Sequence, residues 1–167
     1  GNKSNARNTM IAAGVPVIPG SKEPLYHAEE ALAIAEEVGY PVIVKAALGG
    51  GGKGMRVAYH QDELENAFMT AQKESMAAFG DNTMYLEHFV EHPKHIEFQI
   101  LADSYGHVIH LGERDCSIQR NHQKLIEESP CAIMSDALRQ KMGEAAVNAA
   151  KAAGYVNAGT IEFLLEK

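Results

Sequence analysis

The chain has 167 residues, of which 46% are hydrophobic and 22% charged, and its formal net charge is −7 at pH 7. This length allows one sizeable hydrophobic core or two small ones. The negative charge argues against nucleic-acid binding, which normally needs a basic face. No apolar run reaches transmembrane length and no signal-peptide pattern occurs, so we expect no membrane association. Cys116 and Cys131 show no disulfide or zinc pattern, which favours a reducing cytoplasm.

Apolar periodicity, together with glycine and proline punctuation, predicts helices and strands in an α+β order. Helices are predicted over residues 3–13, 27–38, 61–79 and 135–153. Strands are predicted over residues 41–46, 55–59, 84–90, 96–103, 107–117 and 124–130, with a last strand at the C-terminus. The elements from about residue 15 to residue 90 are expected to form an α+β module around a glycine-rich hairpin, and the later ones an antiparallel sheet backed by a helix. A cleft between two such modules suits a ligand.

Both ends of the chain fall inside predicted elements. The sequence opens within the helical pattern "KSNARNTMIAAG" and stops within the alternating strand "GTIEFLLEK". We therefore interpret the chain as a piece of a longer protein, called the parent below.

The stretch "VIVKAALGGGGKGMRV", residues 42–57, places four consecutive glycines between two apolar segments. A Walker loop requires Ser or Thr after its lysine, but Lys53 is followed by Gly54. A dinucleotide fingerprint requires a helix after the glycines, but "MRVAYH" is strand-like. The remaining geometry is a hairpin whose glycine amides can face anionic oxygens. Lys45 ends an apolar run, where an ammonium is costly unless an anion meets it. A flexible hairpin with a solvated lysine remains the alternative.

A second polar segment, "HLGERDCSIQRNHQK", occupies residues 110–124 between apolar flanks. Its charges are too dense for a core strand, and its first three could form a solvated strand end: Glu113, Arg114 and Asp115. Neutral donors, a titratable ring and a cation follow within six residues: Gln119, His122 and Lys124. Each alone is typical of a solvated loop, but together with the glycine hairpin they favour a site for hydroxyls and an anionic substrate.

Four stretches carry a resemblance to a known family: "KAALGGGGKGMRV", "MYLEHFVEHPKHIEFQ", "ERDCSIQRNHQKLIEESP" and "GYVNAGTIEFL". They resemble the central ATP-grasp portion of biotin carboxylase, and the resemblance extends from Gly1 to Lys167. It implies an α+β ATP-grasp fold with a first helix in residues 1–14 and a lid subdomain bearing the glycine flap in residues 15–90. Residues 91–167 then form part of the second, truncated subdomain.

The resemblance implies roles in nucleotide binding for residues in several segments. Lys3 and Lys45 are expected to contact ATP phosphates, and Gly51 and Gly52 to supply the flap amides. The hinge that holds adenine is expected to comprise Glu87, His88, Phe89 and Val90, with His88 where the family often has lysine. On the ribose and phosphate side the resemblance places His95, Gln119 and His122.

Two further residues match the reacting part of the family's site. Lys124 corresponds to the lysine that holds bicarbonate, and Glu162 to a magnesium-binding carboxylate. Ile161 and Phe163 would face the core while Glu162 points the other way, since side chains alternate along a strand. A merely solvent-facing glutamate is the alternative. Cys116 is interpreted as a packed or ligand-lining residue.

The family converts ATP and bicarbonate into carboxyphosphate, and the CO₂ released from it is transferred to biotin. The resemblance thus implies ATP, Mg²⁺ or Mn²⁺ and biotin, with a biotinylated carrier protein and a carboxyltransferase as partners of a homodimeric parent, as in fatty acid biosynthesis. The chain alone is expected to be inactive, because other family site residues follow the strand where it stops. Alternatives are another ATP-grasp carboxylate-amine ligase, a carbamoyl-phosphate synthase-like domain, or a non-catalytic nucleotide-binding module.

Overall fold

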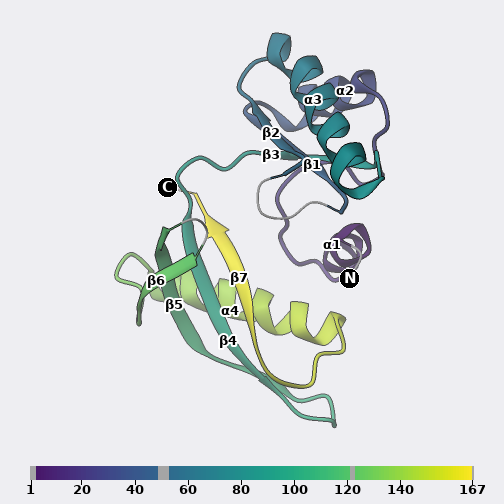
Figure 1. The fold of residues 1–167 in the computed structure, drawn as a ribbon. Helices are drawn as coiled ribbons and strands as arrows, with labels where there is room; N and C mark the ends of the chain where they lie inside the picture. The colour runs from purple at the N-terminus through teal and green to yellow at the C-terminus, as the bar shows by residue number, and fades with distance from the viewer. Residues whose placement is uncertain (1–2, 49–52, 121–122, 167) are drawn as a thin grey trace. The chain divides into compact units, whose positions relative to one another are not determined.

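The computed structural model describes residues 3–48, 53–120 and 123–166, with side chains from residue 6 onward (Figure 1). The chain divides into two compact units. Unit 1 comprises Gly1–Asn8 and Val17–Phe89, and unit 2 comprises Thr9–Pro16 and Val90–Lys167. The first helix, α1 (Lys3–Ala12), contributes residues to both.

Unit 1 is a three-stranded antiparallel sheet packed against two helices (Figure 1). Its strands, in the order β2-β1-β3, are β2 (Met55–Ala58), β1 (Val42–Ala46) and β3 (Met84–His88). Its helices are α2 (Ala28–Val38) and α3 (Gln61–Phe79). Val42, Val44 and Ala46 pack with both helices in one core, so the alternating residues Ile43 and Lys45 face away from the helices.

Local signals explain where these helices begin and end. The carboxylate of Glu30 accepts hydrogen bonds from the amides of Tyr26 and His27, which precede α2. Such contacts satisfy donors that a helix start leaves unpaired and place negative charge at the positive end of the helix dipole. At the C-terminal end of α3, Gly80 adopts a φ of +69°, the left-handed conformation that commonly terminates helices.

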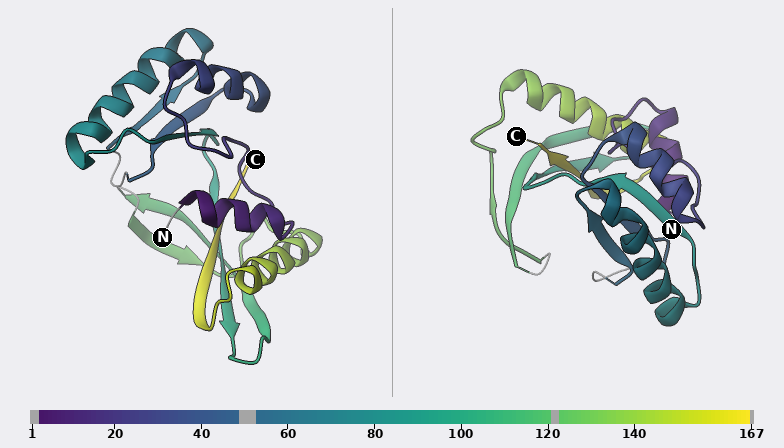
Figure 2. Two further views of the ribbon diagram at one scale, coloured as in Figure 1. Left: turned by 90° about the vertical axis from the view of Figure 1, so that its right-hand side faces the viewer. Right: turned by 90° about the horizontal axis from the view of Figure 1, so that it is seen from above.

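Unit 2 is a four-stranded antiparallel sheet with one long helix on one face (Figure 2). Its strands, in the order β6-β5-β4-β7, are β6 (Gln123–Glu128), β5 (Val108–Arg120), β4 (Lys94–Ala102) and β7 (Asn157–Leu165). Helix α4 (Asp136–Ala152) begins at Ser135, whose hydroxyl accepts the Leu138 amide at 3.2 Å. Ile96, Phe98 and Ile100 of β4 pack in the core beneath α4. The intervening residues of β4 therefore lie on the open face.

The α+β class and the order of elements are confirmed, with two differences at strand ends. The segment "ERDCSIQR" lies wholly within the 13-residue strand β5, which continues to Arg120 rather than ending at residue 117. Its charges are tolerated there because they pair with charges on neighbouring elements. Strand β3 ends at His88 rather than at Val90. The Phe89 amide still donates to the Pro41 carbonyl, but Pro41 has no amide hydrogen with which to return a second bond. No helix in the described part of the chain is long and apolar enough to cross a membrane.

Candidate functional site

On the helix-free face of unit 1, Lys45 is paired with a carboxylate from the neighbouring strand. Its Nζ lies 2.5 Å from Oε2 of Glu87 on β3. The register places Lys45 opposite Tyr85 and Glu87 opposite Ile43, so Lys45 and Glu87 are diagonal neighbours. The sequence predicted that an anion must meet this ammonium, and Glu87 is an anion that does so. A nucleotide phosphate at Lys45 must therefore compete with Glu87.

The hinge segment has some of its polar groups already occupied. The amides of His88 and Phe89 donate to the carbonyls of Pro19 and Pro41, both at 2.8 Å. The His88 ring contacts the Gly39 carbonyl through Nδ1 at 3.1 Å, and the Phe89 ring packs edge-on against Tyr59. A purine held here must use the other polar groups of the segment, which ends at Val90. The Glu87 carboxylate, at the first residue of the expected hinge, accepts a bond from Lys45, so any purine contact through this carboxylate would compete with that bond.

The base of the flap is described, but its tip is not. Gly54 has a φ of +69°, and a Cβ there would lie 2.8 Å from the Cβ of Ala46. The Gly54 carbonyl accepts the Ala46 amide at 2.8 Å, which closes the hairpin. Glycine is thus required at this position by both conformation and space. Gly51, Gly52 and His122, and the side chain of Lys3, lie outside the described residues.

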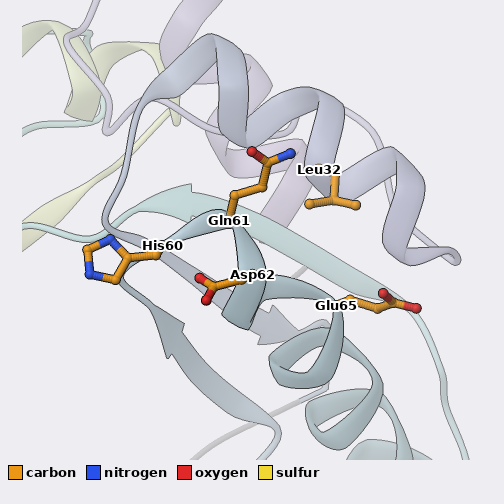
Figure 3. A pocket seen from close by; sticks show the side chains of 5 residues that line it. All are labelled: Leu32, His60, Gln61, Asp62 and Glu65. Atoms are coloured by element: carbon orange, nitrogen blue, oxygen red, sulfur yellow. The ribbon is translucent and has the colours of Figure 1, made fainter.

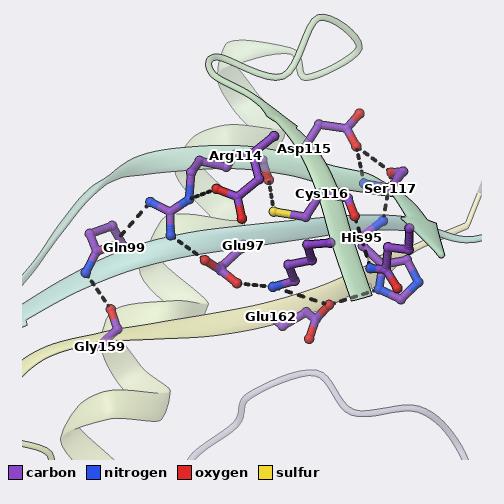
Figure 4. Close-up of polar contacts among 12 residues, drawn as sticks. His95, Glu97, Gln99, Arg114, Asp115, Cys116, Ser117, Gly159 and Glu162 are labelled. Carbon is purple, nitrogen blue, oxygen red and sulfur yellow. Dashed lines mark hydrogen bonds and ion pairs between the residues drawn. The ribbon is translucent and has the colours of Figure 1, made fainter. Parts of the chain in front are cut away.

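On the open face of unit 2, Glu97 connects two cations from different strands (Figure 4). Its carboxylate accepts hydrogen bonds from Arg114 of β5 and from Lys124 of β6. Burial raises the pKa of Glu97, but the hydrogen bonds from Lys124 and Arg114 outweigh burial and lower the pKa overall. The hydrogen bond that Lys124 donates to Glu97 in turn raises the pKa of Lys124. Lys124 is therefore a well-fixed ammonium on this face.

Glu162 lies on the same face and next to the same lysine. Its Oε1 is 2.9 Å from Nδ1 of His95 and 4.0 Å from Nζ of Lys124. Ile161 and Phe163 pack toward the core on the α4 side, as the alternation along β7 predicted. The Glu162 side chain remains 45% exposed, so an oxygen donor is accessible there. The structure thus brings His95, Lys124 and Glu162 together in unit 2.

Two other residues of the polar segment have local roles in this structure. Gln119 donates from Nε2 to the Cys116 carbonyl at 3.0 Å, within its own strand. Cys116 is fully buried, and burial raises the pKa of its thiol. A raised pKa disfavours the thiolate, which agrees with the interpretation of Cys116 as a packed residue.

The remaining acidic residues of β5 anchor the strand to its surroundings. The Glu113 side chain is only 1% exposed and lies 3.0 Å from Nε of Arg139 on α4. Asp115 accepts from Lys94 at 2.9 Å and from Ser117. The suggestion of a solvated strand end is therefore wrong for Glu113, Arg114 and Asp115, because these charges are compensated by specific partners.

Sequence reasoning did not identify Glu97 as part of the cluster. The available signal was a charged residue inside the apolar alternation "HIEFQI", two positions after His95. Side chains two residues apart in a strand share a face. An acidic residue in that pattern needs a cationic partner, and Arg114 and Lys124 supply two.

A separate depression of about 570 Å³ lies on unit 1 between α2 and the start of α3 (Figure 3). It is lined by Leu32, His60, Gln61, Asp62 and Glu65. None of the expected site residues lines it, and its two carboxylates would repel phosphate groups. It is therefore a poor candidate for the nucleotide site.

The donor set for a metal is small. No group of three or more His, Cys, Asp or Glu that could hold an ion occurs among the described residues. Glu162 alone offers an exposed hard oxygen donor within the cluster on the open face of unit 2. That fits Mg²⁺, which is often held by one or two carboxylates and by substrate phosphates.

Comparison with known proteins agrees with this geometry. The family model "Carbamoyl-phosphate synthase L chain, ATP binding domain" matches residues 2–167. The chain is 56% identical over its whole length to biotin carboxylase from Nostoc sp., of which it covers 37%. It therefore spans little more than a third of that relative.

Solved structures give the same result for the fold. The biotin carboxylase beta-gamma-ATP complex from Campylobacter jejuni matches 99% of the chain with a TM-score of 0.88 and 56% identity, over 37% of its own length. A second match is the biotin carboxylase domain dimer of Hydrogenobacter thermophilus 2-oxoglutarate carboxylase, solved in complex with MgADP, ADP and bicarbonate. It matches 100% of the chain with a TM-score of 0.87 and 48% identity, over 37% of its own length. The fold is thus ATP-grasp, and the resemblance to biotin carboxylase is confirmed. The chain belongs to the family of carbamoyl-phosphate synthase L chain ATP-binding domains.

Proposed function

We propose that the chain is the nucleotide-binding part of a biotin carboxylase, which uses ATP and bicarbonate to carboxylate biotin. The observation that carries the proposal is the cluster on the open face of unit 2, where Lys124 is fixed by Glu97 beside Glu162 and His95. The relatives support it, because they are biotin carboxylases with sequence identity along the whole chain. We assign the entry-helix region of the ATP-grasp fold to residues 1–14, the lid subdomain to residues 15–90 and the second subdomain to residues 91–167.

In this proposal the nucleotide is held mainly by charge and backbone donors. Lys3 and Lys45 bind phosphate oxygens, and the amides of Gly51 and Gly52 cover them. The hinge, Glu87 to Val90, receives the adenine, while His95, Gln119 and His122 serve the ribose and phosphate side. Phosphoryl transfer requires positioning and preplaced positive charge more than covalent chemistry, and these residues provide both.

Glu162 is the residue of this chain that would hold Mg²⁺ or Mn²⁺. An ion held there would neutralise negative charge on the nucleotide phosphates. Nδ1 of His95 lies 2.9 Å from Oε1 of Glu162, and this contact orients the Glu162 carboxylate. A carboxylate that is fixed in this way is better placed to hold an ion than a freely rotating one.

Lys124 is the residue that we propose to act on bicarbonate. Its ammonium offsets the charge of an anion that the nucleotide would otherwise repel. Because Glu97 also accepts a hydrogen bond from Arg114, Lys124 does not compensate that carboxylate alone. It can therefore still attract an anion.

The partners of the parent follow from the same proposal. They are a biotinylated carrier protein and a carboxyltransferase, with biotin as acceptor and a homodimeric parent in the cytoplasm. The dimeric biotin carboxylase domain of the Hydrogenobacter protein supports the dimer. The chain alone is proposed to be inactive, because it corresponds to about a third of its relatives.

The alternative within this fold is a carboxylate-amine ligase or a carbamoyl-phosphate synthase-like domain. The matched family model supports it, since that model is named after carbamoyl-phosphate synthase. The two functions differ in the acceptor, so ATP cleavage that depends on both bicarbonate and biotin separates them. A non-catalytic module would bind Mg·ATP without any turnover.

The test uses the parent and its Lys124→Ala variant. We expect the variant to lose biotin-dependent ATP cleavage while calorimetry still detects Mg·ATP binding. Lys141→Ala is the matched control, because Lys141 is exposed on α4. Cleavage that is unaffected by Lys124→Ala would exclude the assigned role, and a parent without turnover would favour the binding module.

A further inference from the structure

Arg7, on α1, is a basic residue to which the family resemblance assigned no role. Its side chain is only 15% exposed, and Nη2 donates to the Ile18 carbonyl at 2.5 Å. Nη1 lies 3.7 Å from Oε1 of Glu87, and Nε is buried without a hydrogen-bond partner in the described part of the chain. A largely buried guanidinium whose Nε–H donor has no partner is unfavourable unless another interaction compensates it.

The Glu87 carboxylate lies between two cations that hold it unequally. Lys45 takes one oxygen at 2.5 Å, whereas the 3.7 Å contact with Arg7 is an ion pair too long for a hydrogen bond. Arg7, Glu87 and Lys45 together carry one net positive charge. The pair with Lys45 is formed, and the pair with Arg7 is available but incomplete.

The backbone around Glu87 is fixed, which leaves the side chain as the part that can move. The Ser21 amide bonds the Leu86 carbonyl at 2.7 Å, and the His88 amide bonds the Pro19 carbonyl at 2.8 Å. Gly20 packs so closely here that a Cβ would lie 2.3 Å from the Leu86 oxygen. A shift of the carboxylate by less than about 1 Å would turn the Arg7 contact into a hydrogen bond.

We propose that Arg7 is a positioning residue which takes over the Glu87 carboxylate when a phosphate draws Lys45 away. The inference rests on the proposed function in one respect, the binding of phosphate by Lys45. If Lys45 left without a substitute, an uncompensated carboxylate would face an incoming polyanion, and like charges at short range repel strongly. Arg7 keeps that charge paired, so Lys45 is free to bind the ligand.

The same combination recurs in unit 2, where Arg114 and Lys124 share the carboxylate of Glu97. There the arginine contact is already a hydrogen bond. In both units a lysine expected at the ligand shares its carboxylate with an arginine.

The test measures dissociation constants of Mg·ADP and of adenosine for variants of the full-length parent. We expect Arg7→Met to weaken Mg·ADP about tenfold or more, the effect of losing a charge-assisted contact, and to leave adenosine unchanged. Adding Glu87→Gln to Arg7→Met should restore most of the lost affinity, because no carboxylate charge is then left to compensate. Arg7→Lys should lose less Mg·ADP affinity than Arg7→Met, since it keeps the charge although a lysine cannot make both contacts of the guanidinium.

Other outcomes separate this inference from the proposed function. Arg56→Met is the matched control, because Arg56 pairs with Glu74 in the same unit. If Arg7→Met weakens both ligands equally and Glu87→Gln does not rescue it, Arg7 is only structural and the inference is wrong. If Lys45→Met leaves Mg·ADP binding unchanged, the proposed phosphate site itself fails. If Arg7→Met does not fold, Arg7→Lys tests the inference, which a tenfold loss without rescue by Glu87→Gln would overturn.

Discussion

Glu97 and Glu162 lie directly opposite each other on the paired strands β4 and β7. Like charges in this position destabilise a sheet. The structure offsets them with cations from two other strands, since Lys124 bonds Glu97 and lies 4.0 Å from Glu162, and Arg114 also bonds Glu97. Two opposed carboxylates repel each other unless a cation compensates them. This arrangement therefore suits a site in which Glu162 can receive a metal ion and Lys124 can receive an anion.

Removal of the shared lysine should expose this repulsion. We expect Lys124→Met to lower the free energy of unfolding of the chain by roughly 1–3 kcal/mol, because the buried Glu97 loses a charged hydrogen bond. Adding Glu162→Gln should recover about 0.5 kcal/mol by removing one of the opposed charges. Urea unfolding followed by circular dichroism measures both, with Lys141→Met as control. Equal stability of Lys124→Met and the unchanged chain would show that Glu97 does not need this cation.

The pKa of Asp115 predicts that the free energy of unfolding depends on pH in the acid range. Burial raises its pKa, but bonds from Ser117 and Lys94 outweigh burial and lower the pKa from 3.8 to about 2. Because the folded pKa is depressed, the stabilisation is present above the unfolded value and is lost as pH falls from about 4 toward 2. Its full size is about 2 kcal/mol.

The measurement compares urea midpoints at pH 5 and pH 2.5. Asp115→Asn should flatten the loss of stability over this interval relative to the unchanged chain. Glu91→Gln is the control, since Glu91 is an exposed loop residue. An Asp115→Asn profile as steep as that of the unchanged chain would mean that other carboxylates dominate acid unfolding.

Within the polar segment of residues 110–124, Glu113 is expected to affect the stability of the fold rather than ligand binding. Arg139 contacts both of its carboxylate oxygens at 3.0 Å, and the Cys131 amide adds a bond at 3.2 Å. Arg139→Met leaves a buried charge with no cation, which should cost on the order of 3 kcal/mol of unfolding free energy.

Glu113→Gln in the Arg139→Met background should recover part of that loss, because a neutral amide is cheaper to bury than a carboxylate. Arg120→Met, at the exposed end of β5, is the control. If Arg139→Met alone has no effect on urea unfolding, the pair does not hold β5 to α4.

These residues show which features were readable from the sequence. The orientation of Glu162 followed from period-two alternation, a local property of the strand. Its contacts with His95 and Lys124 did not follow, because they depend on the strand order β6-β5-β4-β7. That order is set by pairing between segments far apart in the chain, which local patterns do not encode.

The polar segment illustrates the same limit for charge. Its density of charged residues argued against a core strand, yet β5 runs through it, because Arg139, Lys94 and Glu97 from other elements compensate the charges. Likewise, the requirement of Lys45 for an anion was visible from its apolar neighbours. That Glu87 meets this requirement depends on the register between β1 and β3.

Two glycines with the same backbone conformation provide the last prediction. Gly54 and Gly80 both have a φ of +69°, but only at Gly54 would an added Cβ meet a close neighbour, the Cβ of Ala46 at 2.8 Å. Replacement of Gly80 by alanine should therefore cost about 1 kcal/mol of unfolding free energy, the strain of the left-handed conformation. Replacement of Gly54 should cost about 1–3 kcal/mol more, because the extra methyl group overpacks the hairpin base.

The double variant Gly54→Ala with Ala46→Gly isolates the steric part. Removing the Ala46 methyl group makes room for the new one, so Gly54→Ala measured in the Ala46→Gly background should cost no more than Gly80→Ala. Urea unfolding of the four single and double variants supplies these differences. The backbone bond from the Ala46 amide to the Gly54 carbonyl is retained in all of them, since it uses no side-chain atom. Equal costs for Gly54→Ala and Gly80→Ala in the unchanged background would mean that the flap base shifts to accept the methyl group, and that close packing does not require glycine there.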